Sequence, residues 1–90
     1  LGGEEFCLIL DEADAAHAVA AAERCRAQLQ ARPMALAGKA IPMTVSVGVA
    51  VLDAGDRNFE GLLRRADIAL YAAKGGGRNR VELAASGILT

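Results

Sequence analysis

Residues 44–51 read Thr-Val-Ser-Val-Gly-Val-Ala-Val, with a valine at every second position and small residues between. Successive side chains of a β-strand point to opposite faces. This segment therefore predicts a strand with one branched face and one small face. A turn cluster follows at 53–58, and Asn58 at its end is expected to cap a helix.

The segment after Asn58 predicts an amphipathic helix, because its apolar residues recur at intervals of three and four. These residues are Phe59, Leu62, Leu63, Ala66, Ala69, Leu70 and Ala73. Gly75–Gly77 are expected to end this helix, since glycine is common at helix C-termini. Residues 80–83 are then predicted to form a last short strand.

The first third of the chain predicts another strand and another helix. Residues 5–10, Glu-Phe-Cys-Leu-Ile-Leu, are apolar on both alternating faces, which is typical of an interior strand in a covered sheet. Residues 13–32 are rich in alanine and predict a helix. Residues 34–43 predict a loop or a short edge strand, and 84–90 a frayed tail. The predicted order is β-α-β-α-β, in the α+β class.

The first helix is expected to begin after the acidic residues Asp11, Glu12 and Asp14 and to end before Pro33. Its buried stripe is predicted at Val19, Ala22, Cys25 or Arg26, and Leu29.

Length and composition fix the broad class of the protein. The 90 residues are 53% hydrophobic and only 3% aromatic, so one domain with a core of Ala, Val and Leu is expected. Ten basic and eleven acidic residues argue against bulk-charge binding to nucleic acid or an anionic membrane.

No membrane span or secretory signal is visible, and Cys7 and Cys25 are predicted to be reduced core thiols. These features favour a cytoplasmic location.

The start of the chain carries the first candidate site. The sequence opens without Met on Leu1-Gly2-Gly3-Glu4-Glu5, which suggests a piece of a larger protein. The glycines allow close approach of a ligand, and the carboxylates could hold a hard cation. Neighbouring strand residues point to opposite faces, so only one of the two glutamates would reach a given metal. The alternative is an ordinary hairpin turn with solvated acids.

A second candidate site lies at Lys74-Gly-Gly-Gly-Arg78. A lysine at a helix end, a glycine loop and an arginine could clamp a polyphosphate. The alternative is a glycine C-cap in which Lys74 satisfies the last helical carbonyls.

Other polar residues carry weaker predictions. Arg64 and Arg65 are expected on a solvated face, and Asp67 is expected to hydrogen-bond locally or to a base. His17 has no second ligand at helical spacing, and Ser46 has no base in reach by spacing. Metal binding at His17 and nucleophilic catalysis are therefore not predicted.

Three stretches together resemble the GGDEF family of diguanylate cyclases. Residues 1–6, Leu-Gly-Gly-Glu-Glu-Phe, resemble the signature turn in its Glu-containing variant, and 44–50 resemble the family's T-V-S-I-G-V-A strand. Residues 65–79 resemble its R-A-D-x-A-L-Y-x-A-K-x-x-G-R-N helix and loop. The three motifs occur in the right order and cover nearly the whole chain.

The resemblance implies a bacterial signalling reaction in which two GTP molecules condense to cyclic di-GMP and release pyrophosphate. Each domain holds one GTP with Mg²⁺ or Mn²⁺, and two domains face each other as a homodimer. The family fold is a palm-like, ferredoxin-like α+β domain similar to that of nucleotidyl cyclases. The alternative is a catalytically silent relative that binds GTP or cyclic di-GMP and regulates a neighbouring domain.

The resemblance also implies roles for individual residues. Gly2 and Gly3 match the turn against which the nucleotide lies, and Glu4 matches the acid that binds metal and is required for catalysis. Glu5 matches a second acid with a less defined role, and Lys74 and Arg78 match the pair that holds the terminal phosphates. Arg24 matches a helical arginine that helps bind inhibitory cyclic di-GMP in some members.

The resemblance covers about the C-terminal half of the family domain, so residues 1–90 are expected to be that half. The family's first strand, which carries another metal ligand, and its guanine-reading residues would precede Leu1. In the family sheet that strand lies between the strand at 5–10 and the strand at 44–51. We therefore expect these two strands to expose apolar edges, which favours dimerisation or swapping, and we expect the isolated fragment to be inactive. The parent protein could be tethered to a membrane through other domains.

Overall fold

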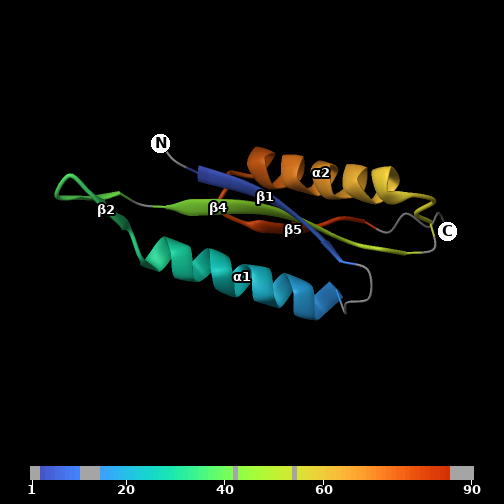
Figure 1. Cartoon of the computed structure of the whole chain (residues 1–90), viewed down its shortest axis with the longest axis horizontal. Coiled ribbons are helices and arrows are strands. Elements are labelled where there is room, and N and C mark those ends of the chain that lie inside the picture. Colours follow the sequence, from blue (N-terminus) through green and yellow to red (C-terminus); the bar gives the residue numbers. More distant parts are fainter. Residues whose placement is uncertain (1–2, 11–14, 42, 54, 86–90) are drawn as a thin grey trace.

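The computed structural model describes residues 3–10, 15–41, 43–53 and 55–85. Three parallel strands, β1 (Gly3–Leu10), β4 (Thr44–Val51) and β5 (Val81–Leu83), form a sheet in the order β1-β4-β5. Helices α1 (Ala15–Ala31) and α2 (Phe59–Gly75) lie on opposite faces of this sheet (Figure 1). The predicted α+β class is confirmed.

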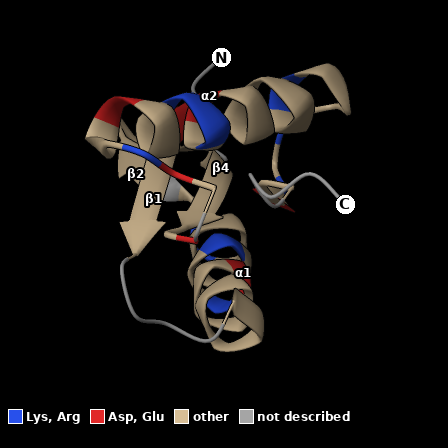
Figure 2. Cartoon of the chain, turned by 90° about the vertical axis from the view of Figure 1, so that its right-hand side faces the viewer, with Lys and Arg blue, Asp and Glu red and all other residues tan. Residues whose placement is uncertain are grey.

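The central strand β4 has the two faces that its sequence predicts. Its valines Val45, Val47 and Val49 join Ala18 and Ala22 of α1 in one buried cluster. On the other face, Ala50 packs with Leu62 and Ala66 of α2. The strand carries no charged residue, whereas both helices do (Figure 2). Most of the buried apolar residues are alanine and valine, as the lack of aromatic residues predicts.

Helix α2 follows its prediction closely. The Asn58 side chain accepts a hydrogen bond from the Gly61 amide at 2.9 Å and caps the helix. The predicted stripe supplies the buried residues Leu62, Ala66, Ala69 and Ala73. Phe59, the first residue of the helix, departs from the prediction with 63% exposure.

Two predictions about α1 are wrong in part, and the segment after it forms two short strands where a loop or one edge strand was expected. The buried stripe of α1 lies at Ala18 and Ala22, whereas Leu29 and Cys25 are exposed, so Cys25 is not a core thiol. Cys25 and Leu29 line an open pocket of about 280 Å³ together with Val45 and Val47, so the sheet does not close over them. The segment after the helix forms a separate antiparallel hairpin of β2 (Met34–Leu36) and β3 (Lys39–Ile41), which projects beyond the sheet (Figure 1).

Strands β1 and β4 pair directly with each other, which contradicts the expected gap between them. The parallel register runs from Gly3 opposite Thr44 to Leu10 opposite Val51. Both strands are eight residues long and have one face toward each helix, so every position of one finds a partner in the other. Their facing edges are therefore paired. Because β1 is at the end of the sheet order, its other edge has no strand partner among the described residues, and the interior position expected for 5–10 is wrong.

Arg65 is not on a solvated face, which corrects another expectation, whereas its neighbour Arg64 is exposed as expected. Its guanidinium donates to both carboxylate oxygens of Asp56, at 3.0 and 2.8 Å. It also donates to the backbone carbonyls of Val51 and Ala85, at 2.6 and 2.9 Å. The Asp56 side chain is only 3% exposed, so this ion pair ties the turn before α2 to the ends of β4 and β5.

Some expectations concern residues outside the described part of the chain. These are the glycine turn at Gly2, the acidic residues Asp11, Glu12 and Asp14, and the tail at 86–90.

Candidate functional site

The start of β1 and the end of α2 bring three of the predicted site residues together. Lys74 Nζ lies 3.3 Å from Glu5 Oε1, and Arg78 Nη1 lies 3.1 Å from Glu5 Oε2. One carboxylate between two cations leaves one net positive charge. The side chains of Lys74, Glu5 and Arg78 are 32%, 38% and 54% exposed, so a dissolved anion can approach them.

Strand alternation explains why Glu5 meets these cations. Cys7 and Ile9 pack against the cluster on the α2 face, so Glu5 shares that face. The Cys7 thiol also donates to Asp67 of α2 at 3.2 Å, so the partner of Asp67 is a thiol 60 residues earlier and not the local group or base expected for it. Burial, followed by the neighbouring Asp67 carboxylate, raises the pKa of Cys7. A raised pKa keeps the thiol protonated and able to donate.

The end of α2 is capped without the Lys74 amine. The amides of Gly76, Gly77 and Arg78 donate to carbonyls of the last helical turn, at 2.8, 3.3 and 2.9 Å. Because backbone donors meet these carbonyls, the Nζ of Lys74 is directed to Glu5 instead. The alternative in which Lys74 serves as a simple C-cap is therefore not what the structure shows.

The loop that carries Arg78 has an unusual backbone. Arg78 and Asn79 have φ values of 63° and 48°, and Gly77 has 117°. Left-handed conformations in consecutive non-glycine residues are uncommon and need support from their surroundings. The Asn79 amide donates to the Oγ of buried Ser46 at 3.1 Å, and the Val47 amide donates to the Arg80 carbonyl at 2.9 Å. These bonds fix the loop to the start of β4.

Lys74 and Arg78 lower the pKa of the Glu5 carboxyl. The hydrogen bonds from Lys74 and then from Arg78 hold the pKa of the Glu5 carboxyl below its ordinary value of 4.5. The folded protein therefore binds a proton at Glu5 less readily than the unfolded chain does. The stability that this contributes is present above the unfolded pKa and is lost as the pH falls through the folded pKa.

We expect an NMR titration of the Glu5 carboxyl carbon to give a pKa below 4.5 in the folded protein. The double variant Lys74→Ala/Arg78→Ala should return this pKa to its ordinary range, because both hydrogen-bond donors are gone. An unchanged Glu5 titration in a folded double variant would show that other groups set its pKa.

Glu4 and Arg24 lie away from the Lys74–Arg78 pair. Glu4 precedes Glu5 in β1 and is exposed on the face that Leu8 turns toward α1. Within the described residues, no Lys, Arg or His nitrogen lies within 4.0 Å of the Glu4 carboxylate. Arg24 is exposed on α1. Glu4 and Glu5 thus lie on opposite faces of β1, as strand alternation predicts, and only Glu5 meets the two cations.

Among the described residues, a divalent cation could be held by a single carboxylate but not by a cluster of protein ligands. They contain no cluster of three or more His, Cys, Asp or Glu side chains. Mg²⁺ is commonly held by one or two carboxylates together with substrate phosphates and water. The exposed Glu4 carboxylate meets that requirement as a single ligand, whereas Glu5 is already neutralised by two cations.

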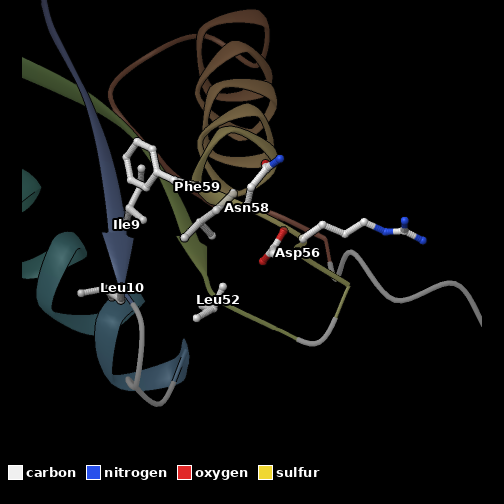
Figure 3. A pocket seen from close by; sticks show the side chains of 8 residues that line it. Ile9, Leu10, Leu52, Asp56, Asn58 and Phe59 are labelled. Carbon is white, nitrogen blue, oxygen red and sulfur yellow. The ribbon is translucent and has the colours of Figure 1, made fainter.

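The cavity shown in Figure 3 lies at the opposite end of the sheet and contains none of the predicted site residues. Its volume is about 590 Å³. Apolar side chains from the ends of β1 and the start of α2 form its wall, including Ile9, Leu10 and Phe59. No long apolar helix suited to crossing a membrane is found in the described segments.

Two contacts of the Arg78 loop were not predicted from the sequence. These are the Ser46 hydroxyl and the Arg26 guanidinium, which donates to Asn79 Oδ1 at 2.9 Å. Periodicity offers Arg26 as an alternative to Cys25 in the buried stripe, and otherwise as a solvated arginine. It carries no information about a loop 53 residues away.

Comparison with known proteins finds the same family that the three sequence motifs resemble. The family described as diguanylate cyclase, GGDEF domain, matches residues 1–80. Diguanylate cyclase A of Treponema denticola is 40% identical over 82 residues, covering 91% of this chain and 22% of that protein. Diguanylate cyclase DosC of Escherichia coli K12 is 41% identical over 83 residues, covering 91% of this chain and 18% of that protein.

The chain thus spans about a fifth of the length of these curated relatives. No solved structure matches it significantly. The glycine-glutamate start, the central strand and the Lys74–Arg78 loop all fall within the matched residues. With a match over most of its length, the chain belongs to the GGDEF domain family of diguanylate cyclases.

Proposed function

We propose that residues 1–90 form the C-terminal portion of a diguanylate cyclase domain that condenses two GTP molecules into cyclic di-GMP. The observation that carries the proposal is the convergence of Lys74 and Arg78 on one anionic group, the Glu5 carboxylate. Two cations that already share one anion, with net positive charge and solvent access, form a site suited to a terminal phosphate. Family membership supplies the reaction class.

In this reaction the 3′-oxygen of one GTP attacks the α-phosphorus of the other, and the bond to pyrophosphate breaks. The same exchange in the opposite direction closes the ring, so two pyrophosphates leave. Lys74 and Arg78 hold the terminal phosphates and stabilise the negative charge that develops on the leaving pyrophosphate. The arginine supplies paired N–H donors, whereas the lysine supplies a compact charge.

Glu4 is the carboxylate proposed to hold Mg²⁺ or Mn²⁺. When bound, such a cation neutralises phosphate charge and lowers the pKa of the attacking hydroxyl. Glu4 is exposed at the same end of β1 as Glu5, while Glu5 has two cationic partners. Glu5 is therefore the weaker candidate for a metal ligand. Gly2 and Gly3 are proposed to lie against the nucleotide, and Arg24 to contact inhibitory cyclic di-GMP.

Several features of the whole protein follow from the same proposal. Each domain binds one GTP, so a homodimer is required to bring two substrates together. The substrate and product place the reaction in the cytoplasm, as part of bacterial signalling. We further propose that the 90 residues alone do not catalyse, because guanine recognition and another metal ligand come from other parts of the domain.

The deciding experiment is a GTP turnover assay with Mg²⁺ on the complete domain and on the 90-residue chain, with the products separated by chromatography. Cyclic di-GMP from the complete domain, and none from the 90 residues, is the expected result. Bound but unreacted GTP in the complete domain would instead favour the silent, regulatory alternative. Cyclic di-GMP from the 90 residues alone would overturn the proposed division of the site.

The double variant Lys74→Ala/Arg78→Ala tests the phosphate site. We expect kcat/KM for GTP to fall by roughly 10²-fold or more, because two charge-assisted hydrogen bonds to the substrate are removed. Arg64→Ala is the matched control, since Arg64 is an exposed cation of α2 outside this cluster. Equal kinetics for the double variant and the control would contradict the phosphate-binding role.

A further inference from the structure

Arg78 reaches Glu5 from a loop whose shape depends on contacts from several elements. After α2 ends, Arg78 and Asn79 both adopt left-handed backbone conformations, with φ values of 63° and 48°. Such conformations are costly in non-glycine residues and persist only where neighbouring groups enforce them. The groups that enforce them here therefore decide where the Arg78 guanidinium lies.

Arg26 of α1 is one of these groups. Its Nη1 donates to Asn79 Oδ1 at 2.9 Å across a separation of 53 residues. The Asn79 amide in turn donates to Ser46 Oγ, in a side chain that is 2% exposed. The Asn79 side chain and backbone are thus held at the same time, from α1 and from β4.

The Arg26 side chain is itself firmly held. Its Nε donates to both carboxylate oxygens of Glu23, at 2.6 and 3.0 Å, and its Nη1 also donates to Gln30 Oε1 at 2.9 Å. The side chain is 17% exposed, so it forms a braced, partly buried link and not a free surface charge. A planar guanidinium with several fixed partners holds a neighbouring side chain such as Asn79 in place better than a flexible lysine does.

Arg80 braces the same loop from another direction. Its Nε donates to the Arg78 carbonyl at 3.2 Å, and its guanidinium lies against Gly76 and Gly77. The loop is therefore held by two sets of contacts: those of Arg80 with the Arg78 carbonyl and the glycines, and those of Asn79 with Ser46 and Arg26. Of these two, the Asn79 anchor is the one that connects to α1.

We propose that Arg26 is a positioning residue, which holds Arg78 in its phosphate-binding place through Asn79. The proposal rests on the proposed function, since it assumes that Arg78 binds a phosphate of the substrate. Arg26 does not touch the substrate. It fixes the left-handed turn at Asn79, and it thereby couples helix α1 on one face of the sheet to the Lys74–Arg78 cluster on the other.

The test is a double-mutant cycle in the complete domain, with inorganic pyrophosphate as the ligand and calorimetry as the readout. We expect Arg26→Ala to weaken pyrophosphate binding roughly three- to tenfold, because the loop is no longer fixed before the ligand arrives. In an Arg78→Ala background, Arg26→Ala should have no further effect. A simple loss of positive charge would instead weaken binding in both backgrounds.

Two control variants separate positioning from charge and from folding. Arg32→Ala removes an exposed cation just after the same helix and should leave pyrophosphate affinity unchanged. Asn79→Ala removes the Oδ1 acceptor without changing the net charge, and it should lose affinity as Arg26→Ala does. This variant also keeps the proposal testable if Arg26→Ala does not fold.

Hydrogen exchange gives a readout that does not depend on any ligand. The Asn79 amide, bonded to Ser46, should exchange faster in Arg26→Ala, while amides in the middle of β4 keep their protection. A folded Arg26→Ala protein with unchanged pyrophosphate affinity would overturn the positioning role. If Arg78→Ala itself leaves the affinity unchanged, the phosphate site of the proposed function fails instead, so the two failures are distinguishable.

Discussion

Gly48→Ala should destabilise the protein by about 3 kcal/mol or more, the largest stability loss expected from adding one methyl group. A Cβ at Gly48 would lie 2.4 Å from the Ala66 carbonyl oxygen and 2.4 Å from the Leu70 amide nitrogen. Both are backbone atoms of α2, so the whole helix must move away from β4. Because a domain of this size is stable by only about 5–15 kcal/mol, the loss should be plain in urea unfolding.

Gly75→Ala is the matched control for this prediction. Nothing lies within 4 Å of a Cβ built on Gly75, which is the last residue of the same helix. Alanine favours the helical state by about 0.5–1 kcal/mol over glycine, so the control should be neutral or slightly stabilising. If Gly48→Ala unfolds at the same urea concentration as the parent, α2 does not pack on the small face of β4 as described.

Glu4→Gln should abolish cyclic di-GMP synthesis by the complete domain, with a fall in kcat of roughly 10³-fold, or about 4 kcal/mol. The amide keeps the size of the side chain but removes the negative charge that a divalent cation requires. Glu4 is exposed on β1 and has no ion-pair partner within the described segments, so folding should be nearly unaffected. The measurement is GTP turnover at saturating Mg²⁺ beside a thermal unfolding curve.

Glu60→Gln supplies the comparison for Glu4→Gln, because it makes the same change at an exposed position in the first turn of α2. Its turnover should equal that of the parent. Full activity in Glu4→Gln would show that the metal-binding carboxylate was assigned to the wrong residue. Glu5, which is held by Lys74 and Arg78, would then be the next carboxylate to change.

The elements with a clear repeat were predictable from the sequence because their faces are set by local geometry. The valine alternation of 44–51 gave the bounds of β4, and the three- and four-residue spacing gave α2 with its Asn58 cap. Helix α1 was placed less accurately along its buried stripe. It is rich in alanine on every side, so its own pattern does not show which side meets the sheet.

Charged residues were harder to interpret, because their environment depends on distant parts of the chain. Arg65 resembles any solvated helical arginine in the sequence, yet it forms an ion pair with Asp56 and bonds two backbone carbonyls. Lys74 resembles a helix C-cap, yet it contacts Glu5, 69 positions earlier in the chain. Neither partner can be identified from spacing, since these contacts form only after helix and sheet pack together.

The sequence by itself determined the family, the order of the main elements and the identity of the candidate site residues, because motifs and periodicities are local properties. The tertiary structure decided which of these residues meet. It paired β1 with β4, turned Glu5 and not Glu4 toward the cations, and joined Arg26 to the Arg78 loop. The physical reason is that strand alternation fixes which side chains share a face, whereas sheet register and helix docking fix the distances between elements.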